Sequence, residues 1–199
     1  MKLVQLMGGS QTLKSPPPLP AGQERWLMNN LILSIMMRSR CEGWTRWFDL
    51  HTNEHIQGRK KGVMNVYPWL CRQTKPVYRW HMDPKIPGCV VYPDAARYKG
   101  SRLFCSTLDW QLALAIYEQF THIELFGFRM MHFAYQYQVE SAQWWVQLAV
   151  SKGIAVTIHG QSALKVKKWT HGPPSIEIPP GCLMYGKETT DRAKIYHSR

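Results

Sequence analysis

The residues of this sequence that are best suited to chemistry are small and polar, and they directly follow an apolar run. Gly8, Gly9 and Ser10 come after the apolar residues 3–7, and Thr12 lies two positions further on. Glycines at such a place let backbone N–H groups approach a phosphate closely, and hydroxyl groups can donate to the same oxygens. The loop matches neither the G-x-G-x-x-G nor the G-x-x-x-x-G-K-S/T pattern. A ligand loop and a purely structural tight turn therefore both stay open.

The start of a predicted helix is a second candidate for anion binding. Ser106, Thr107 and Asp109 fit the S-x-x-D form of a capping box, which is typical of a helix start. The positive end of the helix dipole and the two hydroxyls would suit a phosphate group. Plain capping without a ligand is the alternative.

Asp49 and His51 are the candidates for proton transfer, because both are bases by type and His51 directly follows the expected strand at residues 46–50. The sequence contains no nucleophile elbow, catalytic triad or paired-carboxylate motif. His51 and His55 have the i, i+4 spacing of a metal pair but lack the H-E-x-x-H arrangement, so no metal is predicted.

An aromatic, amide-rich segment at residues 132–138 follows the apolar run 123–127 and contains Tyr135, Gln136 and Gln138. Tyr and Gln side chains suit stacking on a nucleobase and hydrogen bonding to its edge. The alternative is a helix lead-in whose aromatic side chains pack on the protein itself.

Hydrophobic patterning predicts elements that could position these residues. Strands are expected at residues 3–7, 46–51, 76–80, 89–92, 123–127 and 154–158, and helices at residues 23–38, 63–72, 140–152 and from Ser106 onward. This alternation predicts an α/β fold: a Rossmann-like, mainly parallel sheet with helices on both faces. Residues 3–7, 46–50, 123–127 and 154–158 should be neighbouring strands. Ligands should lie at their carboxyl ends, which Arg129 and Ser162 follow.

The chain has 199 residues, and its 25 Lys and Arg against 13 Asp and Glu give a formal net charge of +12. This basic protein could bind nucleic acid, nucleotides or another polyanion, although scattered basic residues also fit a merely solvated surface. We expect one domain over residues 1–199, with a Pro-rich loop at 13–22 and a basic C-terminal extension at 165–199.

Location is indicated by what the sequence lacks. No apolar run approaches the roughly 18 residues of a membrane span, and the N-terminus is too short and interrupted for a secretory signal. The 5 cysteines are widely spread without a C-x-x-C pair, which favours reduced thiols over disulfides or a thiolate zinc site. We expect a soluble cytoplasmic protein with no membrane partner.

An ordered set of motifs resembles a known group of proteins. The motifs are the Gly8–Thr12 loop and the segments at residues 46–51, 103–107, 123–130, 135–136, 152–154 and 162–164. On these motifs the chain resembles small, uncharacterised bacteriophage proteins of Rossmann-like type. More distantly, it resembles the bacterial sialyltransferase and hydroxymethylpterin-pyrophosphokinase-like superfamily, over residues 3–165.

The resemblance implies that the first loop and the Ser106–Thr107 helix start together hold the phosphate and ribose of a nucleotide. It also implies a contact from Asn29 or Asn30. The chain departs from those relatives in two places: its loop lacks their Pro, and Arg129 stands where they usually have an acid. Any catalytic or metal role of that acid is therefore in doubt.

These observations predict a phage-encoded transferase of the host cytoplasm that binds a nucleotide or nucleotide-sugar donor and is glycosyltransferase-like. Nucleic acid, as in DNA modification, is a candidate acceptor. Two alternatives stay open: a non-catalytic protein that binds or sequesters a nucleotide, and a DNA-binding accessory protein.

Overall fold

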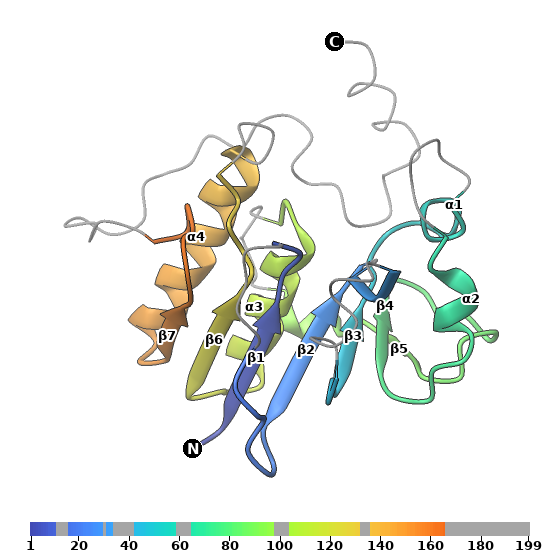
Figure 1. The fold of residues 1–199 in the computed structure, drawn as a ribbon, viewed down its shortest axis with the longest axis horizontal. Helices are drawn as coiled ribbons and strands as arrows, with labels where there is room; N and C mark the ends of the chain where they lie inside the picture. Colours follow the sequence, from blue (N-terminus) through green and yellow to red (C-terminus); the bar gives the residue numbers. More distant parts are fainter. Residues whose placement is uncertain are drawn as a thin grey trace.

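One seven-stranded sheet organises the computed structural model, which describes residues 1–10, 16–29, 31–33, 42–58, 65–97, 104–131 and 136–165 (Figure 1). Of residues 136 and 137 only the backbone is described. The strands are β1 (Leu3–Met7), β2 (Glu24–Met28), β3 (Arg46–Phe48), β4 (Val77–Arg79), β5 (Cys89–Val91), β6 (His122–Phe126) and β7 (Ala155–Ile158). Their order is β5-β4-β3-β2-β1-β6-β7, and every neighbouring pair is parallel. The predicted Rossmann-like α/β fold is confirmed.

The strand β2 corrects the prediction of a helix over residues 23–38. It lies between β1 and β3, so residues 3–7 and 46–50 share a sheet but are not adjacent. Trp26, Leu27 and Met28 are all buried, because a central strand of a parallel sheet is covered on both faces. So short an apolar run fits a helical pattern as well as a strand.

The chain continues beyond β2 into a single turn of 3-10 helix, η1 (Leu31–Leu33), and residues 34–38 lie outside the described residues.

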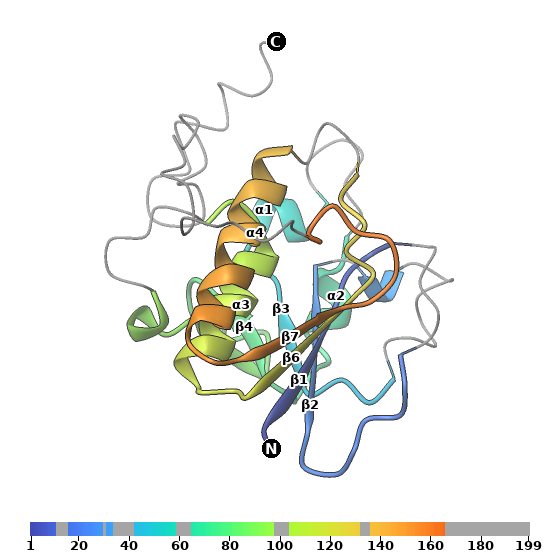
Figure 2. The same ribbon diagram turned by 90° about the vertical axis from the view of Figure 1, so that its left-hand side faces the viewer.

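Helices cover both faces of the sheet. α3 (Thr107–Tyr117) and α4 (Gln136–Ser151) lie together on one face (Figure 2). Side chains alternate between the faces of a strand. In β3, Phe48 shares a face with Arg46, which pairs with Glu118 at the end of α3. Trp47 therefore lies on the opposite face, where it contacts Trp69 of the short α2 (Tyr67–Leu70) at a centroid distance of 4.4 Å. Helices on both faces were predicted, and this is confirmed.

Two short elements, α1 and η3, complete the described structure, and α4 begins earlier than predicted. α1 (Asn53–Ile56) follows β3, and the turn η3 (Asp94–Ala96) follows β5. α4 begins at residue 136 rather than 140, and it ends before Gly153, whose φ of 80° gives the predicted left-handed stop. Among the described residues, no helix has both the length and the apolar character needed to cross a membrane.

A row of polar side chains crosses the sheet on the face opposite α3 and α4. Arg25 donates through Nε to Gln5 at 3.0 Å, and Gln5 donates to Glu124 at 3.1 Å. Arg25 also donates to the carbonyl of Pro17 at 2.8 Å and to that of Glu42 at 2.8 Å. Burial lowers the pKa of Arg25. The arginine thus fastens part of the predicted Pro-rich loop to the sheet.

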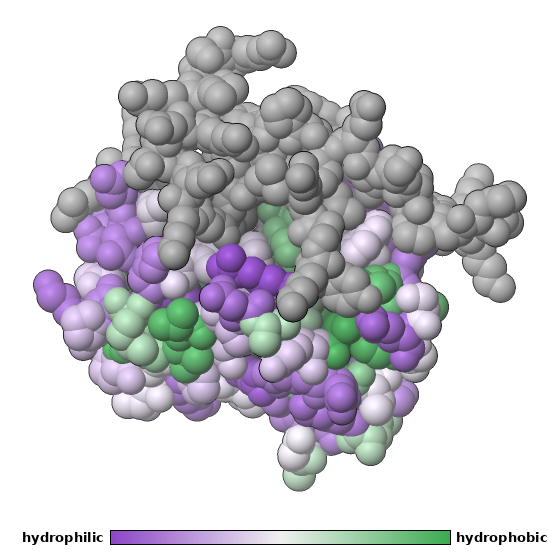
Figure 3. Space-filling model, turned by 180° about the vertical axis from the view of Figure 1, so that it is seen from behind, coloured by the Kyte–Doolittle hydropathy of each residue, from purple (hydrophilic) through white to green (hydrophobic). Residues whose placement is uncertain are grey.

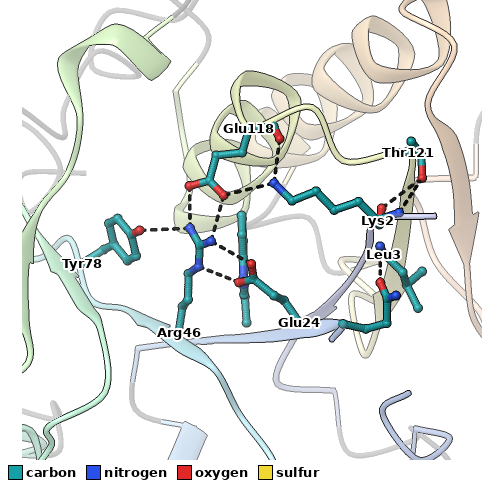
Figure 4. Close-up of polar contacts among 9 residues, drawn as sticks. Lys2, Leu3, Glu24, Arg46, Tyr78, Glu118 and Thr121 are labelled. Carbon is teal, nitrogen blue, oxygen red and sulfur yellow. Dashed lines mark hydrogen bonds and ion pairs between the residues drawn. The ribbon is translucent and has the colours of Figure 1, made fainter. Parts of the chain in front are cut away.

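A cluster of charged side chains lies at the amino-terminal ends of the strands β2 and β3. Figure 4 shows Arg46 between Glu24 and Glu118, with nitrogen–oxygen distances of 2.6 Å to Glu24 and 2.8 Å to Glu118. Arg46 also donates to the hydroxyl of Tyr78 at 3.0 Å. Burial alone would lower the pKa of Arg46, but hydrogen bonds to the two carboxylates outweigh it and raise the pKa. This cluster joins β2, β3 and the end of α3.

The surface seen from behind carries hydrophobic residues in separate patches between hydrophilic ones (Figure 3). Large apolar side chains exposed in the described chain include Met82, Val91, Tyr117 and Val150. Scattered apolar side chains are normal on a protein surface and do not by themselves indicate an interface.

Candidate functional site

A cavity of about 700 Å³ opens where the carboxyl ends of β1, β2 and β6 meet the start of α3. Most of the residues singled out from the sequence line it: Gly8, Gly9, Ser10, His51, Ser106, Thr107, Arg129 and Gln138. The other lining residues were not among the predicted site residues: Met28, Asn29, Leu108, Gly127, Phe128, Met130 and Met131. Asn29 is the exception, because it was named as an alternative to Asn30. The signal of these residues is position, since each lies at or just beyond the carboxyl end of a strand, or in the first turn of α3.

Some predicted site residues do not line the cavity. Asp49 lies behind His51, and the hydroxyl of Ser162 donates to the carbonyl of Phe128, a lining residue. Thr12, Asn30 and Tyr135 fall outside the described residues, and so does the side chain of Gln136.

The glycine loop forms the floor of the cavity. A Cβ at Gly8 would lie 2.6 Å from the carbonyl oxygen of Gly127, so only glycine fits this close approach of β1 and β6. The N–H of Gly8 donates to Phe126 at 2.7 Å, and that of Ser10 donates to Gly127 at 2.9 Å. These two amides therefore hold the floor together and are not donors for a ligand.

The start of α3 forms one wall. The capping box is complete: Ser106 accepts from the N–H of Asp109 at 3.4 Å, and Asp109 accepts from the N–H of Ser106 at 2.8 Å. The next two amides belong to Thr107 and Leu108, and within the described residues no hydrogen bond uses them. Unpaired N–H groups at the positive end of a helix dipole attract an anion.

Two lining residues hold strained backbone conformations. Asn29, at the end of β2, has φ 54°, and Met130, beyond β6, has φ 47°. A left-handed conformation costs an L-residue roughly 1–2 kcal/mol. Such strain is often found where a site needs a particular geometry. Both residues border the same cavity.

A carboxylate–imidazole pair stands at the β3 end of the cavity. Nδ1 of His51 lies 2.8 Å from the carboxylate of Asp49, which is 1% exposed. When Nδ1 donates to this carboxylate, Nε2 carries the lone pair of the neutral ring and can act as a base. The ring of His55 stacks on that of His51 at a centroid distance of 4.0 Å.

The opposite end of the cavity combines a cation with apolar side chains. Arg129 is exposed, and its backbone carbonyl accepts from the N–H of Ala163 at 2.9 Å. Met131 is 60% exposed, and Gln138 of α4 completes this end. This end thus offers positive charge, thioether surface and an amide.

Asp109 lies beneath the start of α3 and is fully buried. Its Oδ2 accepts from the N–H of Cys105 at 2.7 Å and from the hydroxyl of Ser141 in α4 at 2.9 Å. Its Oδ1 has no hydrogen-bond partner within the described chain. Burial raises the pKa of Asp109 to about 7, although these hydrogen bonds favour the charged form.

No group of three or more His, Cys, Asp and Glu side chains that could hold a metal ion occurs among the described residues. The described part of the chain therefore offers a site built from amides, hydroxyls, an arginine and an imidazole. The fold and this cavity together define a parallel α/β protein with a ligand-sized site at the carboxyl edge of its sheet.

No protein-family model matches the chain, and no curated protein matches it. Among solved structures, the chain is similar to the sialyltransferase CstII from Campylobacter jejuni, solved in complex with a substrate analogue, cytidine-5′-monophosphate. The two are 12% identical with a TM-score of 0.49, and the match covers 79% of each chain. Likeness at this level concerns the fold alone. The resemblance to bacteriophage proteins and pterin pyrophosphokinases stays a prediction.

Proposed function

We propose that this protein binds a nucleotide or nucleotide sugar in the cavity and acts as a glycosyltransferase-like transferase. The observation that carries the proposal is the pair of amides, at Thr107 and Leu108, that the capping box leaves over at the cavity wall. Together with Arg129 they present positive potential to one space. Its volume of about 700 Å³ suits a ligand of nucleotide-sugar size.

The phosphate would lie against the α3 amides. During transfer, the acceptor hydroxyl oxygen bonds to the anomeric carbon while the bond from that carbon to the phosphate oxygen breaks. The phosphate leaves with the electron pair, and the amides and Arg129 stabilise its charge. The hydroxyl proton passes to His51, and Asp49 orients the ring and stabilises the imidazolium that forms.

The nucleoside would lie at the Arg129 end. Gln138 lines this part of the cavity, and the neighbouring Tyr135 and Gln136 are proposed to read the base. Thr12, Asn30 and Ser162 remain proposed contributors to the same ligand. A nucleic-acid acceptor remains a proposal that rests on the net charge of +12.

A non-catalytic nucleotide-binding protein is the second candidate, and Arg129 is the observation that favours it. A cation at a strand end where relatives usually carry an acid strengthens binding of a phosphate without supplying a catalytic acid. In that case the nucleotide sugar would bind but stay intact.

A panel of nucleotides and nucleotide sugars tests the proposal, with thermal shift for binding and product detection for transfer. We expect at least one nucleotide sugar to stabilise the protein, and Arg129→Gln to weaken that effect. Lys85→Gln is the matched control, because it removes one positive charge from an exposed turn that does not line the cavity. Stabilisation by no member of the panel would refute the proposal, and binding without product would favour the second candidate.

A further inference from the structure

Asp109 is a buried carboxyl group to which the proposed reaction assigns no part. It lies in the first turn of α3, and its Oδ2 accepts a hydrogen bond from the N–H of Ser106 in the capping box. The same box decides which amides face the cavity: it uses those of Ser106 and Asp109 and leaves those of Thr107 and Leu108. The carboxyl therefore sets the donor pattern of the anion site without touching a ligand.

The partners that hold this carboxyl are all uncharged. On its own side they are the backbone amides of Cys105 and Ser106, and from α4 comes the hydroxyl of Ser141. The other titratable or charged groups to consider are the thiol of Cys105, whose backbone N–H donates to the carboxyl, and His51 and Arg129, which line the cavity at the start of α3. The carboxyl thus has hydrogen bonds to stabilise its charge but no ion pair from these partners.

We propose that Asp109 is a positioning residue of the anion site, and that an anion bound at the start of α3 makes its carboxyl take up a proton. This inference rests on the proposed nucleotide site. The argument is geometric: an anion on the Thr107 and Leu108 amides and a carboxylate on the Ser106 amide share the same positive helix end. Both are negative, and in the buried interior their repulsion is poorly screened.

The direction of the coupling is given by linkage. The pKa of Asp109 is about 7, and a bound anion would raise it further. At low pH the carboxyl of Asp109 is already neutral when an anion binds. At high pH the carboxyl is charged, so it either takes up a proton when the anion binds or repels the anion. Anion affinity should fall as pH rises, by about sevenfold between pH 6 and pH 8.5 for a pKa that rises by one unit, with no more than one proton taken up per anion.

Sulfate is a suitable probe, because its charge stays constant over this pH range. Its binding is followed by the backbone amide NMR signals of Thr107 and Leu108, and protonation by the carboxyl carbon signal of Asp109. Both are measured in a His51→Gln background, since a protonated imidazole would also favour an anion. We expect the midpoint of the Asp109 titration to rise by about one pH unit when sulfate is present.

Two variants separate the coupling from a general role in folding. In Asp109→Asn the pH dependence of sulfate affinity should vanish. Ser141→Ala removes a hydrogen bond that favours the ionised form, so the midpoint of the pH dependence should move to higher pH. Ser151→Ala, a surface change on the same helix, is the matched control and should leave the midpoint of the pH dependence unchanged.

The outcomes are distinct. An unchanged Asp109 midpoint with sulfate bound, or a Ser141→Ala curve that coincides with that of the parent protein, would overturn the inference. The same holds if a nucleotide sugar binds but sulfate leaves the Thr107 and Leu108 amide signals unmoved. If neither binds at any pH, the proposed function fails and the inference falls with it.

Discussion

The hydroxyl of Thr107 in α3 donates a hydrogen bond of 3.0 Å to the side-chain Oδ1 of Asn29, whose backbone is left-handed at φ 54°. The bond joins the end of β2 to the start of α3, two walls of the cavity. β3 holds the same residue from the other side: the N–H of Asn29 donates to Phe48 at 2.8 Å, and its carbonyl accepts from the indole of Trp47 at 3.1 Å. The backbone of Asn29 is therefore held by β3 and its side-chain amide by α3.

Two substitutions at Asn29 should separate strain from ligand contact. Asn29→Gly tolerates the left-handed backbone, whereas Asn29→Ala does not, so the alanine variant should be less stable than the glycine variant by about 1 kcal/mol. Both should lose about 1–2 kcal/mol of nucleotide affinity, because both remove the amide. Urea denaturation and titration calorimetry measure the two effects. Unchanged affinity in both variants would leave Asn29 a purely structural role.

Removal of the imidazole should affect transfer rather than binding. His51→Gln is expected to lower the transfer rate about 10²- to 10⁴-fold, the usual contribution of a general base, with nucleotide affinity nearly unchanged. Asp49→Asn should lower it as well, since the ring then loses the carboxylate that orients it. Steady-state kinetics measure both, and His81→Gln, at an exposed position, serves as control. Equal rates for all three variants would exclude His51 as the base.

The stability of the protein should depend on pH through Asp109. Its folded pKa of about 7 lies above the ordinary value of 3.8, so between these values the folded state holds a proton that the unfolded chain releases. Stability therefore falls as pH rises through this window, by about 2.5 kcal/mol between pH 5 and pH 8 for this group. Urea denaturation at both pH values measures it.

Asp109→Asn supplies the comparison, because its side chain is neutral at both pH values. The variant should lose this part of the pH dependence. The same slope in variant and parent protein would mean that other groups cause it.

The Arg46 cluster should matter for stability and not for ligand. Arg46→Ala leaves the carboxylates of Glu24 and Glu118 close together and partly buried, so we expect a loss of about 2–3 kcal/mol of unfolding free energy. Lys2→Ala breaks a more exposed pair of 3.8 Å and should cost less than about 1 kcal/mol. Nucleotide affinity per folded molecule should match the parent protein in both variants, because the cluster lies at the opposite edge of the sheet. Calorimetry beside denaturation checks this.

Local signals in the sequence predicted the elements whose structure is decided locally. α3 was found because Ser106 and Asp109 cap each other within four residues, and the end of α4 because Gly153 stops it. The prediction failed at β2, where Arg25 is buried only through partners distant in sequence, among them Gln5 and Pro17. No short-range pattern contains that information.

The site shows the same division. His51 and Arg129 were predicted because they follow strand ends, and the cavity brings them together with the start of α3. Asn29 could be named only as an alternative to Asn30, because its left-handed backbone depends on Phe48 and Trp47 in β3. The apolar residues Met130 and Met131 gave no signal beyond their position after a strand end, since methionines after a strand more often pack in the interior.

The close approach of Gly8 to Gly127 has a consequence for how this cavity could diversify. Its floor is made of main chain, and a single added methyl group at Gly8 would lie 2.6 Å from a carbonyl oxygen. Substitution can therefore hardly reshape the floor without breaking the junction of β1 and β6. Changes of ligand preference, in evolution or in the laboratory, would have to arise on the walls, at positions such as Met131 and Gln138 where side chains can be exchanged.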